Sequence, residues 1–262
     1  MASKSRGFRR RLKSAFLGPD WAYRLCLRLR YGAGRVREKP ALPLPNGVLQ
    51  NTAEWKQALA HGKRMHLPLH RSEEKAWDHL AAVFAIVAET TPKARVLDAG
   101  AELYSNVLPA LFAYGYRDLI GINLDFDVPA RRGPIRYLHG DITQTSFDAA
   151  SFDAACCMSV IEHGVKLEDY FCEMHRILKP GGLLITSTDY YPTSIDARGQ
   201  SAHGAPVKIF TRSEIEAALR LAQEAGFELT GDVNLDCHEK PVRWAQYNLD
   251  YTFAIFTLRK KR

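Results

Sequence analysis

Short apolar runs alternate with amphipathic segments through residues 95–188. Five runs have the length and composition of buried strands, and they lie at 95–99, 119–123, 135–138, 154–158 and 183–188. Apolar side chains then recur at helical spacing over 166–178, and Pro180 with the two glycines after it predicts a sharp helix end. Because strands alternate with helices, the pattern predicts an α/β fold with a doubly wound, mostly parallel sheet.

Further elements flank this alternating region. Ser72 is placed to cap a helix that runs to about Glu89, with an apolar face formed by Trp77, Leu80, Ala81 and Phe84. Thr211 and Glu214 have the spacing of a capping box at the start of another helix. Two closing segments, which begin at Phe227 and Tyr251, predict an antiparallel pair at the edge of the sheet.

The amino-terminal part differs in composition. Residues 1–38 combine arginines with interleaved leucines and aromatics, and a helix break is expected at Gly18-Pro19. A proline-rich linker follows, so we expect a basic leader and linker over 1–46 and a domain over 47–262, with its core at 72–258.

The net charge of +7 is unevenly distributed along the chain. The first 40 residues hold twelve Lys and Arg against two acids, a net charge of +10, so the remainder of the chain carries −3. Two interpretations of residues 1–38 stay open: docking to an anionic surface, or a solvated leader. Interleaved Leu and Trp favour a membrane over nucleic acid as the surface, and no nucleic-acid partner is expected of the acidic remainder.

Composition limits the classes of protein that fit. The 262 residues are 46% hydrophobic, which suffices for one substantial core, and no apolar run approaches the roughly 18 residues of a membrane span. No secretory signal is recognisable. Five cysteines without C-x-x-C spacing indicate reduced thiols and a cytoplasmic location, at the membrane periphery if the leader docks there. The nine histidines are scattered, so no metal site is expected.

The first predicted strand ends in Asp98-Ala99-Gly100 and passes directly into a helix. This arrangement is typical of a nucleotide-binding βαβ unit, in which backbone N–H groups face a polar ligand at the carboxyl end of a strand. Asn123 ends the second strand, where a polar side chain lies near a ribose. Only Gly100 of a glycine-rich turn is present, so a ligand-free strand-turn-helix stays open on this motif alone.

Six short motifs follow one another in the order of a known family. They are Val96-Leu97-Asp98-Ala99-Gly100, Gly121-Ile122-Asn123, Gly140-Asp141-Ile142, Phe152-Asp153, Ser159-Val160-Ile161-Glu162-His163 and Ile177-Leu178-Lys179-Pro180-Gly181-Gly182. Together they resemble the class I S-adenosylmethionine-dependent methyltransferases, in the small-molecule branch that includes ubiquinone-type methyltransferases. The resemblance covers about residues 72–258. It implies a seven-stranded Rossmann-like sheet, S-adenosyl-L-methionine as cofactor, and methylation of a small or carrier-linked molecule, more at oxygen than at nitrogen.

The resemblance also implies the roles of single residues. Asp98 would accept a hydrogen bond from the amino group of the cofactor, and Gly100 would let the backbone approach its methionine part. Asp141 and Ile142 would hold the adenine, and Ser159 would lie under the methyl donor. The implied cofactor-binding set is Asp98, Ala99, Gly100, Asn123, Asp141, Ile142 and Ser159.

This chain departs from the family pattern at the turn. Asn123 stands where the family has an acid that grips the ribose, with Asp125 two residues further on as a substitute. Glu102 and Tyr104 occupy the places of two further glycines. These departures support an alternative function: a catalytically degenerate adaptor that docks to a membrane through its basic leader.

Methyl transfer to a hydroxyl requires a base, and two candidates follow predicted strands. His163 comes after the fourth strand and Asp189 after the fifth, so both are expected at the carboxyl edge of the sheet. His163 with its neighbour Glu162 has the alternative role of ordering the loop. Tyr190 and Tyr191 contact a substrate or simply pack, and His70, in a loop expected over the cleft, is a further substrate candidate.

Overall fold

The computed structural model describes residues 15–32, 34, 44–202 and 204–262. Most of its strands form one ten-stranded sheet, in the order β1-β12-β7-β6-β2-β3-β5-β4, with β10 and β11 also paired to β12. The strands of this sheet are β1 Gly47–Val48, β2 Arg95–Ala99, β3 Asp118–Asn123, β4 Ala130–Arg132, β5 Ile135–His139, β6 Phe152–Met158, β7 Leu178–Tyr190, β10 Phe227–Leu229, β11 Val242–Trp244 and β12 Leu249–Lys260. A separate short pair consists of β8 Ser201–Ala202 and β9 Ala205–Pro206.

The five central strands, β5, β3, β2, β6 and β7, are parallel, as the alternating pattern predicted. β12 runs antiparallel to β7 from Thr252 opposite Tyr190 to Arg259 opposite Leu183, and β10 pairs antiparallel with β12. These seven strands confirm the predicted doubly wound architecture with its antiparallel edge. The short strands β1, β4 and β11 extend the sheet beyond the expected seven.

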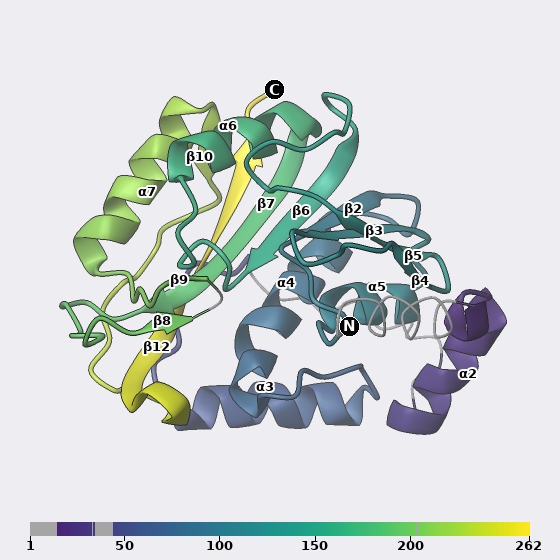
Figure 1. The fold of residues 1–262 in the computed structure, drawn as a ribbon, viewed down its shortest axis with the longest axis horizontal. Helices are drawn as coiled ribbons and strands as arrows, with labels where there is room; N and C mark the ends of the chain where they lie inside the picture. Colours follow the sequence, from purple (N-terminus) through teal and green to yellow (C-terminus); the bar gives the residue numbers. More distant parts are fainter. Residues whose placement is uncertain (1–14, 33, 35–43, 203) are drawn as a thin grey trace.

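Helices cover both faces of the sheet (Figure 1). One face packs against α4 and α5, and the other packs against α6 and α7, so two apolar clusters lie on opposite sides of the strands. The helices are α2 Asp20–Tyr31, α3 Thr52–Arg64, α4 Ala76–Glu89, α5 Val107–Ala113, α6 Leu167–Ile177 and α7 Arg212–Glu224, with 3-10 turns at Glu73–Lys75 and Ala245–Tyr247.

The first residues of α4 and α7 and the apolar face of α4 can be compared with what the sequence predicted. The capping box of Thr211 and Glu214 is confirmed at the start of α7. The cap expected from Ser72 is wrong, because its side chain makes no capping bond and a 3-10 turn precedes α4. The expected apolar face of α4 is also incomplete, since Asp78 and His79 are buried beside Leu80. Helical periodicity alone does not reveal a polar group that tertiary contacts satisfy.

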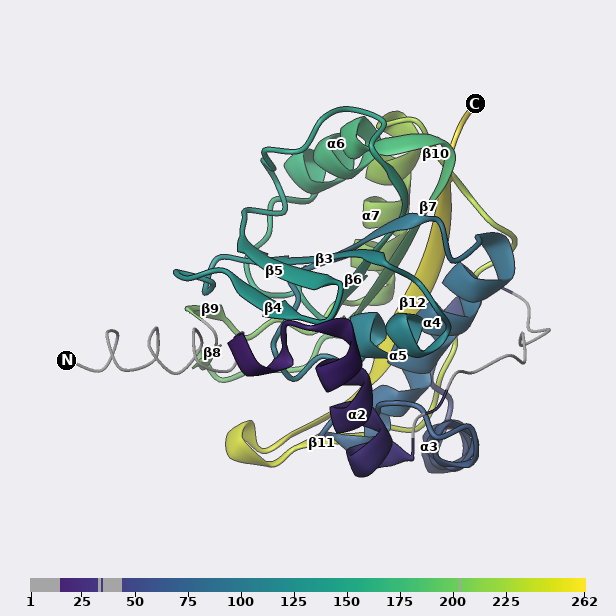
Figure 2. The ribbon, with the colours of Figure 1, turned by 90° about the vertical axis from the view of Figure 1, so that its right-hand side faces the viewer.

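Helix α2, in the part of the chain that the sequence predicts to be a leader, packs on α5. α2 begins directly after Pro19, at the break that the sequence predicted, and Tyr23 stacks on Phe112 of α5 with 5.6 Å between ring centroids. Figure 2 shows α2 at the surface, next to α5. Residues 1–14, 33 and 35–43, which hold nine of the twelve Lys and Arg of the first 40 residues, lie outside the described residues. Within the described chain, no helix has the length and hydropathy needed to cross a membrane.

Candidate active site

Gly100 forms the turn at the carboxyl end of β2. Its φ of +90° is a left-handed conformation that favours glycine, and its N–H donates to the carbonyl of Ile122 over 2.9 Å. A Cβ atom at this position would lie 2.4 Å from Cγ2 of Val160, in the turn that follows β6. The protein's own packing therefore requires glycine here, in addition to any close approach of a cofactor.

Asp98, one of the implied cofactor ligands, is directed into the protein. Its side chain is buried and accepts a hydrogen bond from Ser105 Oγ over 3.0 Å, while the thiol of Cys156 lies 3.7 Å away. Burial raises the pKa of Asp98 to about 6, against the hydrogen bonds from Ser105 and Cys156, which lower it. In this arrangement Asp98 fixes the turn that carries Ser105, and Ala99 beside it is fully buried.

Asn123 uses its amide to close the same turn. Its Nδ2 donates to the carbonyls of Ala101 and Gly100 over 3.1 and 3.4 Å, and its Oδ1 accepts from the backbone N–H of Asp125 over 2.9 Å. A carboxylate could not donate to the two carbonyls, which gives a physical reason for the amide at this position. The expected ribose contact is thus not what holds the Asn123 side chain in place.

The two residues that replace the family's glycines take different positions. Tyr104 is 44% exposed, and its ring meets the His70 ring edge-on at 5.4 Å between centroids. Burial raises the pKa of Tyr104, and the negative charge of the half-buried Glu102 adds to this shift and to that of Asp98. Tyr104 thus leans toward the His70 loop and solvent instead of packing into the core.

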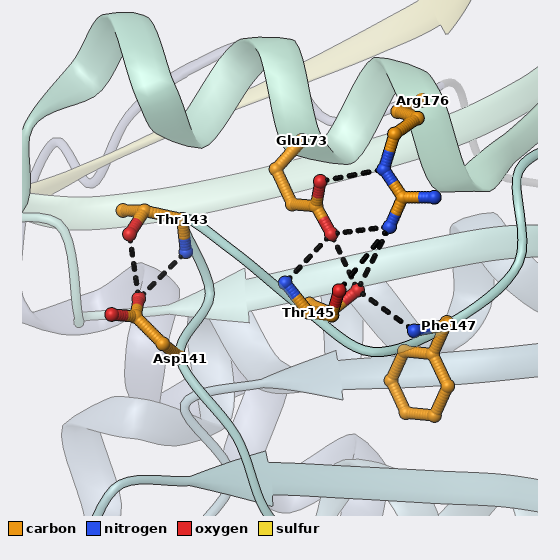
Figure 3. Close-up of polar contacts among 6 residues, drawn as sticks. All are labelled: Asp141, Thr143, Thr145, Phe147, Glu173 and Arg176. Carbon is orange, nitrogen blue, oxygen red and sulfur yellow. Dashed lines mark hydrogen bonds and ion pairs between the residues drawn. The ribbon is translucent and has the colours of Figure 1, made fainter.

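The loop after β5 carries the two residues expected at the adenine. Asp141 is exposed, and its Oδ1 accepts hydrogen bonds from the backbone N–H and the hydroxyl of Thr143, whereas Ile142 is buried. Figure 3 shows that a second set of contacts anchors this loop to α6. Glu173 accepts from the N–H of Thr145 over 2.7 Å and from Nε of Arg176 over 2.8 Å. The pKa of Glu173 is lowered, since hydrogen bonds from Arg176 and Thr145 outweigh its burial.

These residues fit S-adenosylmethionine at its adenine end. The Asp141 carboxylate lies at the carboxyl edge of the parallel strands, where open α/β sheets bind ligands, and the buried Ile142 beside it supplies an apolar surface for a ring. At the ribose end, Asn123 is engaged with the turn, and Asp125 two residues further on is exposed. The site therefore offers contacts at the adenine end, whereas the side chains of Asp98 and Asn123 bond partners within the protein.

Ser159, at the carboxyl end of β6, has a backbone strained into the left-handed region with φ of +53°. Its hydroxyl accepts a hydrogen bond from Nζ of Lys75, in the 3-10 turn before α4. The same ammonium lies 3.7 Å from Oδ2 of Asp78 and 3.5 Å from the ring centroid of Phe253. Three segments far apart in the sequence thus meet at Lys75.

Three buried carboxylates surround this lysine. Asp78 accepts from Ser187 Oγ over 2.7 Å, and Glu162 accepts from Thr188 Oγ1 over 3.0 Å. Asp189, at the end of β7, accepts a hydrogen bond from the hydroxyl of Tyr251. We refer to Lys75, Ser159, Asp78, Glu162, Asp189 and Tyr251 as the Lys75 cluster.

Burial controls the ionisation of the two acids next to β7. Burial, and then the neighbouring Asp189, raises the pKa of Glu162, and Lys75 opposes this shift. Burial raises the pKa of Asp189 as well, whereas Lys75 and Tyr251 lower it. A carboxylate with a raised pKa is a stronger base than an ordinary one, provided that it stays ionised. Among these acids, the geometry favours Asp189, because Lys75 and Tyr251 both stabilise its charge.

The remaining candidates lie in different environments. His163 is half-buried in the turn after β6, where its backbone N–H donates to the carbonyl of Val160. Tyr190 is fully buried and its hydroxyl donates to the carbonyl of Leu235 over 2.7 Å, which corresponds to the packing alternative. Tyr191 is half-exposed, with Nζ of Lys240 4.4 Å from its ring centroid. His70 is neutral at physiological pH, because burial lowers its pKa to about 4.

Sequence reasoning missed Lys75, Asp78 and Tyr251. Lys75 and Asp78 stand at the start of an ordinary amphipathic helix, and Tyr251 opens a β-branched strand, so each was assigned to structure alone. The one indication in the sequence was Asp78, a charged residue next to the apolar positions of α4. Among the described residues, no group of three or more His, Cys, Asp and Glu side chains is arranged to hold a metal ion.

Comparison with known proteins shows which families this chain is similar to. Residues 97–186 match a family model described as methyltransferase domain. The sterol 24-C-methyltransferase of Debaryomyces hansenii is 29% identical over 119 residues, which is 42% of this chain and 31% of that protein. The 24-methylenesterol C-methyltransferase 2 of Oryza sativa subsp. japonica is 26% identical over 168 residues, or 58% of this chain and 46% of its own length. This chain thus spans less than half the length of these relatives, and they do not point to a ubiquinone-specific branch.

Solved structures show the same fold. Phosphoethanolamine N-methyltransferase 2 of Haemonchus contortus, determined with S-adenosyl-L-methionine, superposes with a TM-score of 0.53 at 15% identity, covering 70% of this chain and 52% of that one. An S-adenosylmethionine-dependent methyltransferase of Methanosarcina mazei gives 0.50 at 16% identity, covering 67% and 96%. Residues 97–186 thus match a methyltransferase domain, and the chain has the α/β Rossmann-like fold of methyltransferases.

Proposed function

We propose that this protein is an S-adenosylmethionine-dependent methyltransferase that acts on a small or carrier-linked molecule. The observation that carries the proposal is the Lys75 cluster, which places a buried, ionisable carboxylate at the carboxyl end of β7, beside Ser159. The family match over residues 97–186 supports the choice of cofactor. Together they provide a site for the methyl donor and a base for the acceptor.

The residues of this chain would divide the work. Asp141 and Ile142 bind the adenine, with Glu173 holding their loop against α6. The bound cofactor supplies the methyl group from its sulfonium. Asp189 takes the proton that the acceptor loses, and Lys75 keeps Asp189 charged until then. His163 is the second candidate for this base, and Tyr191 and His70 are the half-exposed side chains proposed to contact the acceptor.

Oxygen is the acceptor atom that we propose first, because a hydroxyl needs the base that the Lys75 cluster offers. Carbon is the alternative, since several relatives are named as sterol C-methyltransferases. The protein would be incubated with S-adenosylmethionine labelled with ¹³C at the methyl group and with lipid and polar metabolite extracts. An O-methyl carbon resonates far downfield of a C-methyl carbon, so the product spectrum decides between the two.

Cofactor binding is the first test of the proposal. Calorimetry with S-adenosylhomocysteine should show binding to the full chain, and Asp141→Ala should weaken it. Asp148→Ala is the matched control, because Asp148 is exposed in the same loop and outside the proposed site. Absence of binding at high micromolar ligand would contradict the proposal.

The base is tested by a pair of variants. Asp189→Asn should lower the rate of labelled methyl incorporation by about 100-fold or more, while the affinity for S-adenosylhomocysteine changes little. His163→Gln should leave most of the activity. The reverse ranking would assign the base to His163.

A second candidate is the degenerate adaptor at a membrane. It is favoured by the turn after β2, where Asn123 bonds the backbone and Glu102 brings a negative charge close to Asp98. The adaptor requires that S-adenosylhomocysteine does not bind, so the same calorimetry separates the two functions. An anionic membrane as partner of residues 1–38 and a cytoplasmic location are proposals under either function.

A further inference from the structure

Large apolar side chains gather on one face of α2. Trp21, Leu25 and Leu29 are 71%, 49% and 79% exposed, and their spacing of four residues places them in one stripe along the helix. Phe16, just before α2, is 80% exposed. Elsewhere in the described chain, the exposed large hydrophobic side chains are Tyr104 and Leu124. We refer to Trp21, Leu25 and Leu29 as the α2 stripe.

The opposite face of α2 fixes the direction of this stripe. Tyr23 and Leu27 are buried in the main apolar cluster, and Tyr23 stacks on Phe112. Asp20 pairs with Arg117 over 3.6 Å at the start of the helix. Because the inner face already packs on the domain, the exposed α2 stripe points away from it.

Positive charge accompanies the stripe. Arg28, three residues after Leu25, lies on the same face of the helix, and both Arg28 and Arg30 are exposed. Asp20 is the one acid of α2 and is paired with Arg117. Six further Lys and Arg and no acid stand in the sequence of residues 1–14. The apolar stripe with an arginine beside it is complementary to a surface that has anionic groups above an apolar layer.

We propose that α2 lies flat on a lipid bilayer that contains anionic lipids. The α2 stripe occupies the boundary between headgroups and acyl chains, and Arg28 beside it contacts lipid phosphates. A helix of 12 residues is too short to cross the bilayer, and Trp side chains favour its interface. This inference goes beyond methyl transfer and does not depend on it.

Two other occupants fit the surface less well. A nucleic acid would use the arginines but would leave the α2 stripe exposed to water. A second copy of the chain, joined by a two-fold axis along the stripe, would bring Arg28 close to its own copy and create repulsion. A bilayer satisfies the apolar and the charged groups at once.

Co-sedimentation of the full chain with vesicles tests the proposal. Phosphatidylcholine vesicles that contain phosphatidylserine should pellet the protein, and the variant with Trp21→Ser, Leu25→Ser and Leu29→Ser should partition about tenfold less or worse. Leu124→Ser is the matched control, because Leu124 is 60% exposed in the loop after β3, and it should pellet like the unmodified chain. Arg28→Glu should reduce pelleting with phosphatidylserine and leave binding to pure phosphatidylcholine unchanged.

The contrary outcomes are equally definite. Equal pelleting of the unmodified chain and the triple variant would overturn the proposal, as would failure of the unmodified chain to pellet with either kind of vesicle. If sedimentation velocity shows a dimer for the unmodified chain and a monomer for the triple variant, the stripe would be assigned to an interface with a second copy. Binding of single-stranded RNA without vesicle binding would assign the arginines to nucleic acid. An unchanged far-ultraviolet circular dichroism spectrum and a cooperative thermal unfolding transition show that the triple variant is folded, and neither measurement depends on methyl transfer.

Discussion

At the carboxyl ends of β2 and β3, polar side chains bond partners mostly within one continuous βαβ unit, with the Cys156 thiol near Asp98 as the exception. At the ends of β6 and β7, they bond partners from distant segments. Ser105 donates to Asp98 and Asn123 donates to Ala101, all inside residues 98–123. The Lys75 cluster instead joins side chains from residue 75 to residue 251.

The two regions also differ in what they stabilise. At the ends of β2 and β3, a few hydrogen bonds fix the shape of a backbone turn, and each is worth about 1 kcal/mol. At the ends of β6 and β7, charges are buried, and each depends on its partner to offset the loss of hydration. We therefore expect substitutions in the Lys75 cluster to have larger effects than most substitutions at the turn.

Lys75→Met should give the largest effect. It leaves the fully buried Asp78 without its cation, so the free energy of unfolding should fall by about 3–5 kcal/mol in urea titrations. Lys63→Met is the matched control, because the Lys63 side chain is 60% exposed and its pair with Glu73 should contribute less than about 1 kcal/mol. Adding Asp78→Asn to Lys75→Met should recover part of the loss, and no recovery would show that packing outweighs charge here.

Gly100→Ala tests the one position of the β2–β3 region where we expect a large loss of stability. The new Cβ combines a left-handed backbone with a clash against Val160, so we expect a loss of about 3 kcal/mol in the same titrations. Gly199→Ala has a positive φ with open space around it and should lose only about 1 kcal/mol. Equal losses would mean that Val160 moves aside and that backbone strain alone requires the glycine.

The raised pKa of Asp98 predicts a pH dependence. Its pKa is about 6 in the folded protein and 3.8 in the unfolded chain, so the folded state binds the proton more tightly. The stabilising contribution is present below about pH 4 and is lost as the pH rises to about 6, up to about 3 kcal/mol. Asp98→Asn should flatten this part of the stability profile, measured by thermal unfolding at a series of pH values. An unchanged slope in the variant would mean that Asp98 is not the group that titrates.

Asn123→Asp should give the smallest effect and sharpens the contrast between the two regions. The carboxylate cannot donate to the carbonyls of Gly100 and Ala101, so we expect a loss of about 1–2 kcal/mol in unfolding free energy. The change also restores the acid that the family resemblance places at the ribose. Tighter binding of S-adenosylhomocysteine by this less stable variant would show that the turn opens to accept the ribose. Weaker binding would show that the amide-closed turn is the form that binds.

Much of the fold could be predicted from local patterns. Period and turn residues predicted the five parallel strands, α6, the Thr211 capping box and the antiparallel closing strands, because each depends on neighbours within a few residues. The same patterns failed at Asp78 and His79, which are buried on α4, and at the Ser72 cap. Their environments depend on contacts with Ser187, Asn106 and the 3-10 turn, which no local pattern encodes.

The candidate site divides in the same way. Periodicity along the chain is enough to place Asp98, Gly100, Asn123 and Asp141 at the carboxyl edge, since each lies at or just after the end of a strand of a parallel sheet. The folded molecule is needed to see that Asn123 closes the turn and that Lys75 joins Ser159 to Asp78. The physical reason is that strand ends are placed by periodicity, whereas a buried charge is placed by partners that folding brings from elsewhere in the chain.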